Sequence, residues 1–118
     1  MTQEQIKNYV RAAIYIRTAA DNAEAAAEQR KECIQYLESK GYFFVKEYAD
    51  INTSGLKNTR SALDAMTIDA HLGEFDKIVI FSMSRISRSQ TECITFCHDL
   101  KESCGISIEF VEGSVLLQ

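Results

Sequence analysis

Apolar runs of strand length alternate with segments of helical periodicity along the chain, and this alternation limits the fold more than any other feature. Four apolar runs bounded by charged or turn residues are typical of strands covered on both faces: 11–17, 42–48, 76–82 and 106–111. Apolar residues recur at helical spacing in the three segments between them: 23–40, 60–72 and 89–103. The order β-α-β-α-β-α-β favours right-handed crossovers. The sequence therefore predicts a three-layer α/β fold, with a mainly parallel sheet of four to five strands and helices on both faces.

Length and composition point to a single globular domain over residues 1–118. A chain of 118 residues can bury about two thirds of its unfolded surface, enough for a core without metal or disulfide staples. Its 46% hydrophobic and 25% charged residues exclude a disordered, collagen-like or coiled-coil protein. The net charge of −4 argues against coating nucleic acid by bulk charge, although it leaves room for a local basic patch.

Neither a membrane segment nor a cofactor site is expected. No apolar run approaches the ~20 residues of a membrane helix, and the first ten residues lack the apolar core of a secretory signal. We therefore expect a cytoplasmic protein with reduced cysteines. Cys93, Cys97 and Cys104 share a helical face, but the neighbouring His98 points about 100° away from Cys97, so we expect no metal site. No glycine-rich nucleotide-binding motif occurs, and we expect no cofactor.

Arginines follow the predicted strands at the edge where open parallel sheets form their sites. They come from three separate stretches of the chain: Arg17, Arg60, and the pair Arg85 and Arg88. A guanidinium group binds phosphate through two parallel hydrogen bonds and stays charged at every working pH. The pattern predicts a crevice that attracts a phosphate ester and stabilises charge developing on its oxygens.

A purely structural interpretation of the same arginines is also open at this point. Arg85 and Arg88 could lie on one solvated turn, while Arg17 and Arg60 pair with Asp50 and its neighbours. Spacing alone does not separate this interpretation from a phosphate site.

Five short motifs, weak one by one, occur together in a specific order. They are Tyr15-Ile-Arg17, Ala26-Ala-Glu-Gln29, Asp50 followed by Ser54-Gly55, Arg60 with Leu63, and Ser84-Arg-Ile-Ser-Arg88. From residue 11 to residue 112, the chain resembles the N-terminal catalytic domain of the serine site-specific recombinases, the resolvase/invertase family. Ser84 stands where many members carry Asp, and the Ser-Arg-x-Ser-Arg form is more similar to the large serine integrases and transposon recombinases.

The resemblance implies metal-free cleavage and exchange of DNA strands. A serine at the end of the first strand attacks the phosphodiester and forms a 5′-phosphoserine linkage, while arginines hold the non-bridging oxygens and help expel the leaving oxygen. The physical chemistry agrees, because phosphoryl transfer rests largely on positioning and charge stabilisation. The catalytic positions carried over are position 19, Arg17, Asp50, Arg60, Arg85 and Arg88. The phosphate- or DNA-binding positions carried over are Tyr15, Gln29, Ser54 and Ser84.

The chain departs from the family motif Tyr-x-Arg-x-Ser at the nucleophile. It reads Tyr15-Ile-Arg17-Thr18-Ala19, and Ala19 has no hydroxyl. Thr18 should not substitute, because neighbouring side chains on an extended segment face opposite ways. We therefore expect a domain that does not cleave DNA, with Ala19 either a natural degeneration or an engineered inactivation.

A second departure concerns the parts of the family that recognise DNA. Members continue into a long dimerisation helix and a separate DNA-binding region, neither of which is expected in residues 1–118. Contacts with the DNA phosphate backbone should then be weak and salt-dependent, without base specificity. Homo-oligomer formation stays open. An alternative hypothesis is a non-catalytic interaction or regulatory domain derived from a recombinase.

Overall fold

A computed structural model describes residues 2, 5, 9–19, 22–51 and 60–113 of the chain. Within them lie four strands: β1 (Arg11–Arg17), β2 (Phe43–Asp50), β3 (Lys77–Ile80) and β4 (Ser107–Phe110). The helices are α2 (Ala23–Ser39), α3 (Ser61–His71), α4 (Gln90–Cys104) and the 3₁₀ turn η1 (Met83–Arg85). The strands are all parallel, in the order β2-β1-β3-β4.

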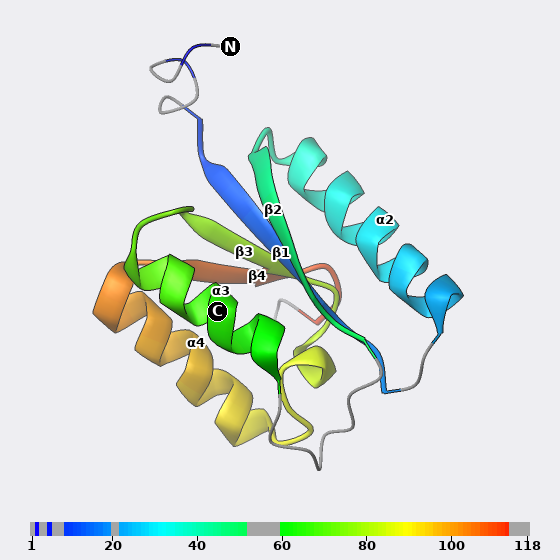
Figure 1. Cartoon of the computed structure of the whole chain (residues 1–118). Helices are drawn as coiled ribbons and strands as arrows, with labels where there is room; N and C mark the ends of the chain where they lie inside the picture. The colour runs from blue at the N-terminus through cyan, green and yellow to red at the C-terminus, as the bar shows by residue number, and fades with distance from the viewer. Residues whose placement is uncertain (1, 3–4, 6–8, 20–21, 52–59, 114–118) are drawn as a thin grey trace.

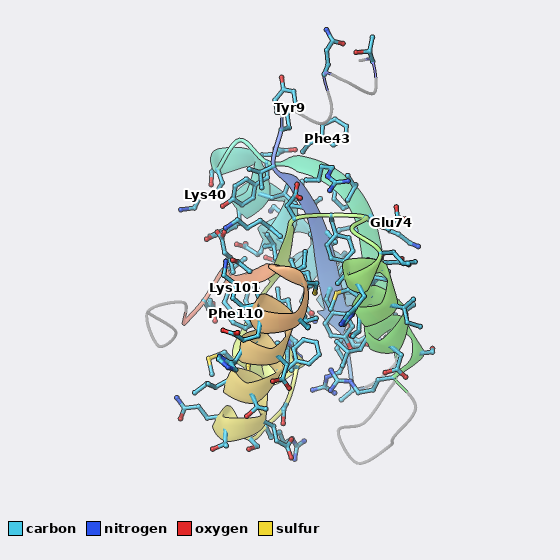
Figure 2. All side chains as sticks on the ribbon, turned by 90° about the vertical axis from the view of Figure 1, so that its left-hand side faces the viewer. Tyr9, Lys40, Phe43, Glu74, Lys101 and Phe110 are labelled. Carbon is cyan, nitrogen blue, oxygen red and sulfur yellow. The ribbon has the colours of Figure 1, made fainter. Side chains whose placement is uncertain are left out.

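The helices cover both faces of this sheet. α2 packs on one face, whereas α3 and α4 pack on the other (Figure 1). Figure 2 shows α3 and α4 side by side on their common face. The predicted three-layer α/β fold is confirmed, with four strands in the described part of the chain. No described helix is both long and apolar enough to cross a lipid bilayer.

Two strand ends differ from the sequence prediction by two residues, and both differences shape the site. The second strand continues to Asp50, which the turn-rich composition placed in a loop, because Ala49 and Asp50 pair in register with Ile16 and Arg17 of β1. The third strand stops at Ile80, and η1 begins at Met83. Pairing of β2 with β1 thus outweighs the local turn propensity of the segment around Asp50. This pairing brings Asp50 next to the end of the central strand.

β1 forms the centre of the core because it is covered on both faces. Ala12, Ala13, Ile14, Tyr15 and Ile16 are all fully buried. Because side chains alternate along a strand, Tyr15 joins the cluster beneath α3 and α4, whereas Ile14 and Ile16 join the cluster beneath α2. The strand that delivers Arg17 is therefore buried from Ala12 to Arg17.

Local signals start and stop the helices. Asn22 caps α2 by accepting the backbone N–H of Ala25 at 3.0 Å, and Ser89 caps α4 by accepting that of Glu92 at 3.2 Å. Gly105, with φ of 72°, ends α4 in the left-handed region that favours glycine. α3 has no such cap of its own, since the residue before it is Arg60.

The packing of α2 on the sheet should depend on Leu37. This side chain is 1% exposed, and we expect Leu37→Ala to lower the free energy of unfolding by about 2–5 kcal/mol because it leaves a cavity. Leu72→Ala is the matched control, since Leu72 is 69% exposed, and it should change stability by less than about 0.5 kcal/mol. Denaturant unfolding followed by circular dichroism measures both, and equal losses would contradict this account of the core.

Candidate functional site

The four predicted arginines meet at the carboxyl end of the sheet. Arg17, Arg60 and Arg88 line one hollow of about 310 Å³, together with residues of the loop before α4 and of its first turn: Ile86, Ser87, Ser89 and Glu92. Arg85 lies beside this hollow, where its Nη1 donates to the backbone oxygen of Arg17 at 3.4 Å. Burial, and then the positive charges of Arg60, Arg85 and Arg88, lower the pKa of Arg17. We call this hollow the arginine hollow. It concentrates positive charge in a chain whose net charge is −4.

Two of these arginines also hold the loop that follows β3. Arg17 donates from Nε to the backbone oxygen of Arg85 and from Nη2 to that of Ser84, each at 3.1 Å. Arg60 donates to the backbone oxygens of Arg85 and Ile86. The Nε atoms of Arg60 and Arg85 are buried without a partner among the described residues. The guanidinium groups of Arg17 and Arg60 therefore order the loop.

A buried network explains why Arg60 lies where it does. The Tyr15 hydroxyl donates to Oδ2 of Asp50 at 2.7 Å and accepts from Nη2 of Arg60 at 3.0 Å. The Asp50 carboxylate also accepts the backbone N–H groups of Ala62, at 2.9 Å, and Leu63, at 3.1 Å. Asp50 thus supplies the cap that α3 lacks, from a neighbouring strand. Burial and the bond to Asp50 raise the pKa of Tyr15, so its hydroxyl stays protonated as a donor.

This network changes the roles expected for Tyr15 and Asp50. Asp50 was carried over as a catalytic position and Tyr15 as a phosphate- or DNA-binding position, but Tyr15 is 0% and Asp50 4% exposed. Neither side chain is therefore accessible from the surface, and their described contacts connect them to Arg60 and to the start of α3. Arg60 reaches Asp50 through the Tyr15 hydroxyl, not through the direct pairing that the structural interpretation expected.

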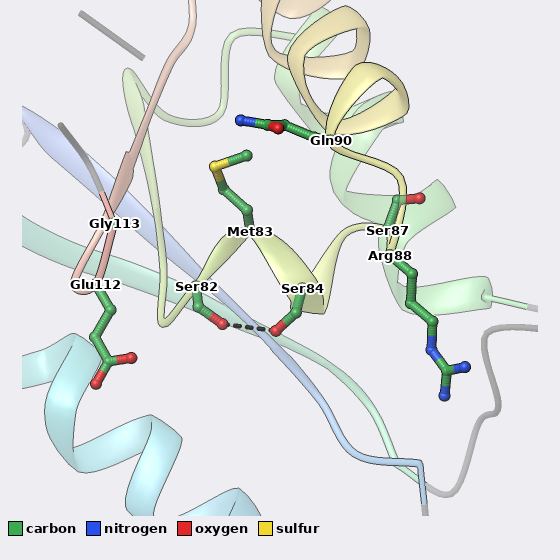
Figure 3. A pocket seen from close by; sticks show the side chains of 8 residues that line it. All are labelled: Ser82, Met83, Ser84, Ser87, Arg88, Gln90, Glu112 and Gly113. Atoms are coloured by element: carbon green, nitrogen blue, oxygen red, sulfur yellow. Dashed lines mark hydrogen bonds between the residues drawn. The ribbon is translucent and has the colours of Figure 1, made fainter. Parts of the chain in front are cut away.

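The predicted Gln29 and Ser84 occupy different environments. Gln29 is buried, accepts the backbone N–H of Arg17 at 3.3 Å and donates to its backbone oxygen at 3.0 Å. It anchors the end of β1 to α2 and is not accessible to DNA. Ser84 is exposed, bonds the Ser82 hydroxyl at 2.8 Å and lines a second hollow of about 510 Å³ (Figure 3). Ser54 lies outside the described residues.

At the nucleophile position, the side chains of Thr18 and Ala19 have opposite environments, as predicted. Thr18 is buried, and its backbone N–H donates to the backbone oxygen of Asp50 at 3.1 Å. Ala19 is exposed in the bend after β1. The accessible position therefore carries a methyl group, and the neighbouring hydroxyl lies inside the protein.

Comparison with known proteins decides the family. The family model described as "Resolvase, N terminal domain" matches residues 12–116. The chain belongs to this resolvase family. The match includes the four arginines and almost the whole sheet. A comparison with the curated proteins finds no match.

Solved structures agree with this assignment. The N-terminal catalytic domain of TP901-1 integrase has a TM-score of 0.80 at 25% identity, over 88% of this chain and 79% of that one. The C-terminal catalytic domain of ISC1926 TnpA, an IS607-like serine recombinase, has a TM-score of 0.77 at 30% identity, over 88% and 69%. A resolvase family site-specific recombinase from Streptococcus pneumoniae shares the fold, with a TM-score of 0.76 at 19% identity over 89% and 74%.

The predicted site residues of this resolvase domain do not include four that line the arginine hollow, Ile86, Ser87, Ser89 and Glu92. A signal for Glu92 was available, because Ser89-Gln-Thr-Glu92 has the spacing of a helix-capping box. That spacing indicates the start of a helix but not what lies beside it. Only the packing of α4 against the loop places the Glu92 carboxylate among arginines.

The Tyr15 hydroxyl should contribute measurably to the stability of this resolvase domain. Tyr15→Phe leaves Asp50 and Arg60 without one partner each, and we expect a loss of about 1–3 kcal/mol in the free energy of unfolding. Tyr48→Phe is the control, since Tyr48 also donates to a carboxylate, that of Asp69, which is less buried than Asp50. Its loss should be the smaller one in denaturant unfolding. An equal or larger loss for Tyr48→Phe would argue against the buried network.

Proposed function

We propose that this chain is the catalytic-type domain of a serine site-specific recombinase and that its arginine hollow holds a phosphodiester of the DNA backbone. The observation that supports this is the meeting of Arg17, Arg60 and Arg88, from three separate stretches, around one hollow. Structural neighbours named as catalytic domains of an integrase and of a serine recombinase point the same way.

The chemistry of the hollow suits a phosphate diester. Guanidinium groups donate parallel hydrogen bonds to phosphate oxygens and stabilise the charge that develops on them. Burial strengthens this effect because Arg17 is only 7% exposed. Arg88 is exposed at the rim and reaches solvent from the loop. We assign the first encounter with the DNA backbone to Arg88 and the deeper contacts to Arg17 and Arg60.

In this proposal the domain holds the phosphodiester without cutting it. A phosphoserine intermediate needs an accessible hydroxyl, and Ala19 has none. Asp50, Tyr15 and Gln29 act as positioning residues for Arg60 and Arg17. Ser84 and Arg85 flank the bound backbone, and the function needs no metal or cofactor. DNA as the partner, a homo-oligomeric state and a cytoplasmic location stay predictions.

Binding of a short DNA duplex tests the phosphate site. We expect Arg88→Ala to weaken binding by about tenfold and to reduce the slope of log affinity against log salt by about one, because one phosphate contact is lost. Arg30→Ala is the matched control, since the exposed Arg30 pairs with Glu47 outside the arginine hollow. Fluorescence anisotropy at several salt concentrations measures both. Equal losses for the two variants would refute a phosphate site at this end of the sheet.

Restoring the hydroxyl tests the catalytic assignment. Ala19→Ser, in a chain joined to the dimerisation helix and DNA-binding region of a relative, should form a covalent protein–DNA adduct that survives denaturation. The matched protein with Ala19 should form none. If Ala19→Ser binds the site DNA but gives no adduct, the arginine hollow is not arranged for cleavage.

A second candidate function rests on an apolar surface of α3. Ile68 and Leu72, one helical turn apart, are 61% and 69% exposed, the highest values among the large apolar side chains described. Exposed apolar pairs of this kind suit protein contacts. A non-catalytic interaction domain would lose association on Leu72→Ser and keep it on Arg88→Ala. The recombinase-type function requires instead that Arg88→Ala weakens DNA binding and that Leu72→Ser leaves DNA binding unchanged.

A further inference from the structure

A carboxylate lies in the arginine hollow without pairing to the arginines beside it. Glu92 lines this hollow together with Arg60 and Arg88. The structure describes all three side chains, and the ion pairs that it contains join other residues, namely Arg11 to Asp76, Arg30 to Glu47, Lys46 to Asp69, and Lys77 to Glu109. Glu92 and Arg88 are both exposed, so the attraction between them is modest and a competing hydrogen bond can outweigh it. Among the described residues, another contact restrains the Glu92 carboxylate.

Ser87 provides this restraint. Its hydroxyl donates to Oε2 of Glu92 at 2.6 Å and accepts the backbone N–H of Ser89 at 3.0 Å. In an ordinary capping box the glutamate itself would accept that N–H. Here the Ser87 hydroxyl stands between the two groups and holds the carboxylate at the first turn of α4, where the helix dipole also favours a negative charge.

The restraint lies at the boundary between two hollows. Ser87 and Arg88 line both the arginine hollow and the larger hollow beside it. Figure 3 shows Arg88 extending to the side of the loop away from Met83 and Glu112. Glu112 lines only the larger hollow. Among the described residues, Glu92 is the carboxylate that lines the arginine hollow.

We propose that Glu92 is a built-in counter-charge that competes with phosphate for the arginine hollow, and that Ser87 is the positioning residue that holds it aside so that a phosphodiester can enter. The inference rests on the proposed function, because it concerns the affinity of the same site. Glu92 lowers the affinity of the hollow for an anion, since a nearby negative charge repels a second one. Ser87 limits this effect, because without its hydroxyl the carboxylate is free to turn toward the guanidinium groups and block them.

Removal of the Glu92 charge and removal of the Ser87 hydroxyl should therefore change the affinity for a phosphodiester in opposite directions. The probe is dithymidine monophosphate, which carries a single phosphodiester, titrated against the protein at low salt and followed by NMR chemical shifts. We expect Glu92→Gln to raise the affinity by about threefold and Ser87→Ala to lower it by a similar factor. In the Glu92→Gln background, Ser87→Ala should have no effect, because Ser87 acts through the charge that is already gone.

Matched controls separate this device from general effects of charge and of helix stability. Glu102→Gln removes the same charge from an exposed position on α4, and Ser103→Ala removes an exposed hydroxyl from that helix. Neither should change the affinity. Ser87→Thr keeps a hydroxyl for the contacts with Glu92 and Ser89 and should leave the affinity unchanged. The Glu92→Gln background then distinguishes positioning of Glu92 from a loss of support for the start of α4, because only the latter would persist there.

The outcomes are distinct. Tighter binding by Glu92→Gln, weaker binding by Ser87→Ala and no additional effect in the double variant support the proposal. Unchanged or weaker binding by Glu92→Gln, or an equal effect of Ser87→Ala in both backgrounds, overturns it and leaves the phosphate site itself standing. Absence of binding to the original protein and to every variant overturns the phosphate site as well.

Discussion

The buried carboxylate of Asp50 is the group on which the arrangement of the site depends. It lies at the end of β2, away from water, and three donors satisfy it: the Tyr15 hydroxyl and the backbone N–H groups of Ala62 and Leu63. An unpaired charge at such a position would be very costly. The same contacts join the central strand, the second strand and the start of α3. Arg60, the residue just before α3, is placed by this network.

The arginines have two roles in this arrangement, and the roles support each other. Arg17 and Arg60 donate to backbone oxygens of the loop after β3. These contacts fix the loop that carries Arg85 and Arg88, so that several positive charges stay close together. Such a cluster is unfavourable without an anion, and the lowered pKa of Arg17 reflects both its burial and this repulsion. A bound phosphate would relieve the repulsion, which connects the stability of the loop to its proposed function.

The chain belongs to the resolvase family, and the residue at position 19 shows how this member departs from the family motif. The resolvase domain model spans residues 12–116, and the arginine cluster suits the proposed binding of a phosphodiester. The accessible residue after β1 is Ala19, while the hydroxyl of Thr18 is in the protein interior. The proposed phosphate-binding arginines and the position expected for a nucleophile are thus separable, because the arginines depend on contacts among β1, β2, α3 and the loop, none of which needs a hydroxyl at position 19.

Pattern alone determined the alternation of strands and helices, the position of the arginines after the strands, and the missing hydroxyl, because these follow from local periodicity and from single residues. Tertiary contacts decided the rest. Asp50 belongs to a strand because it pairs with Arg17 of β1, and its partners lie 35 residues before it and 12 to 13 residues after it. Tyr15 and Gln29 contact Arg60 and Arg17 inside the protein because packing buries them, and Glu92 lines the arginine hollow because α4 packs beside the loop. Burial and contacts between distant residues depend on the assembled fold, and no local pattern encodes them.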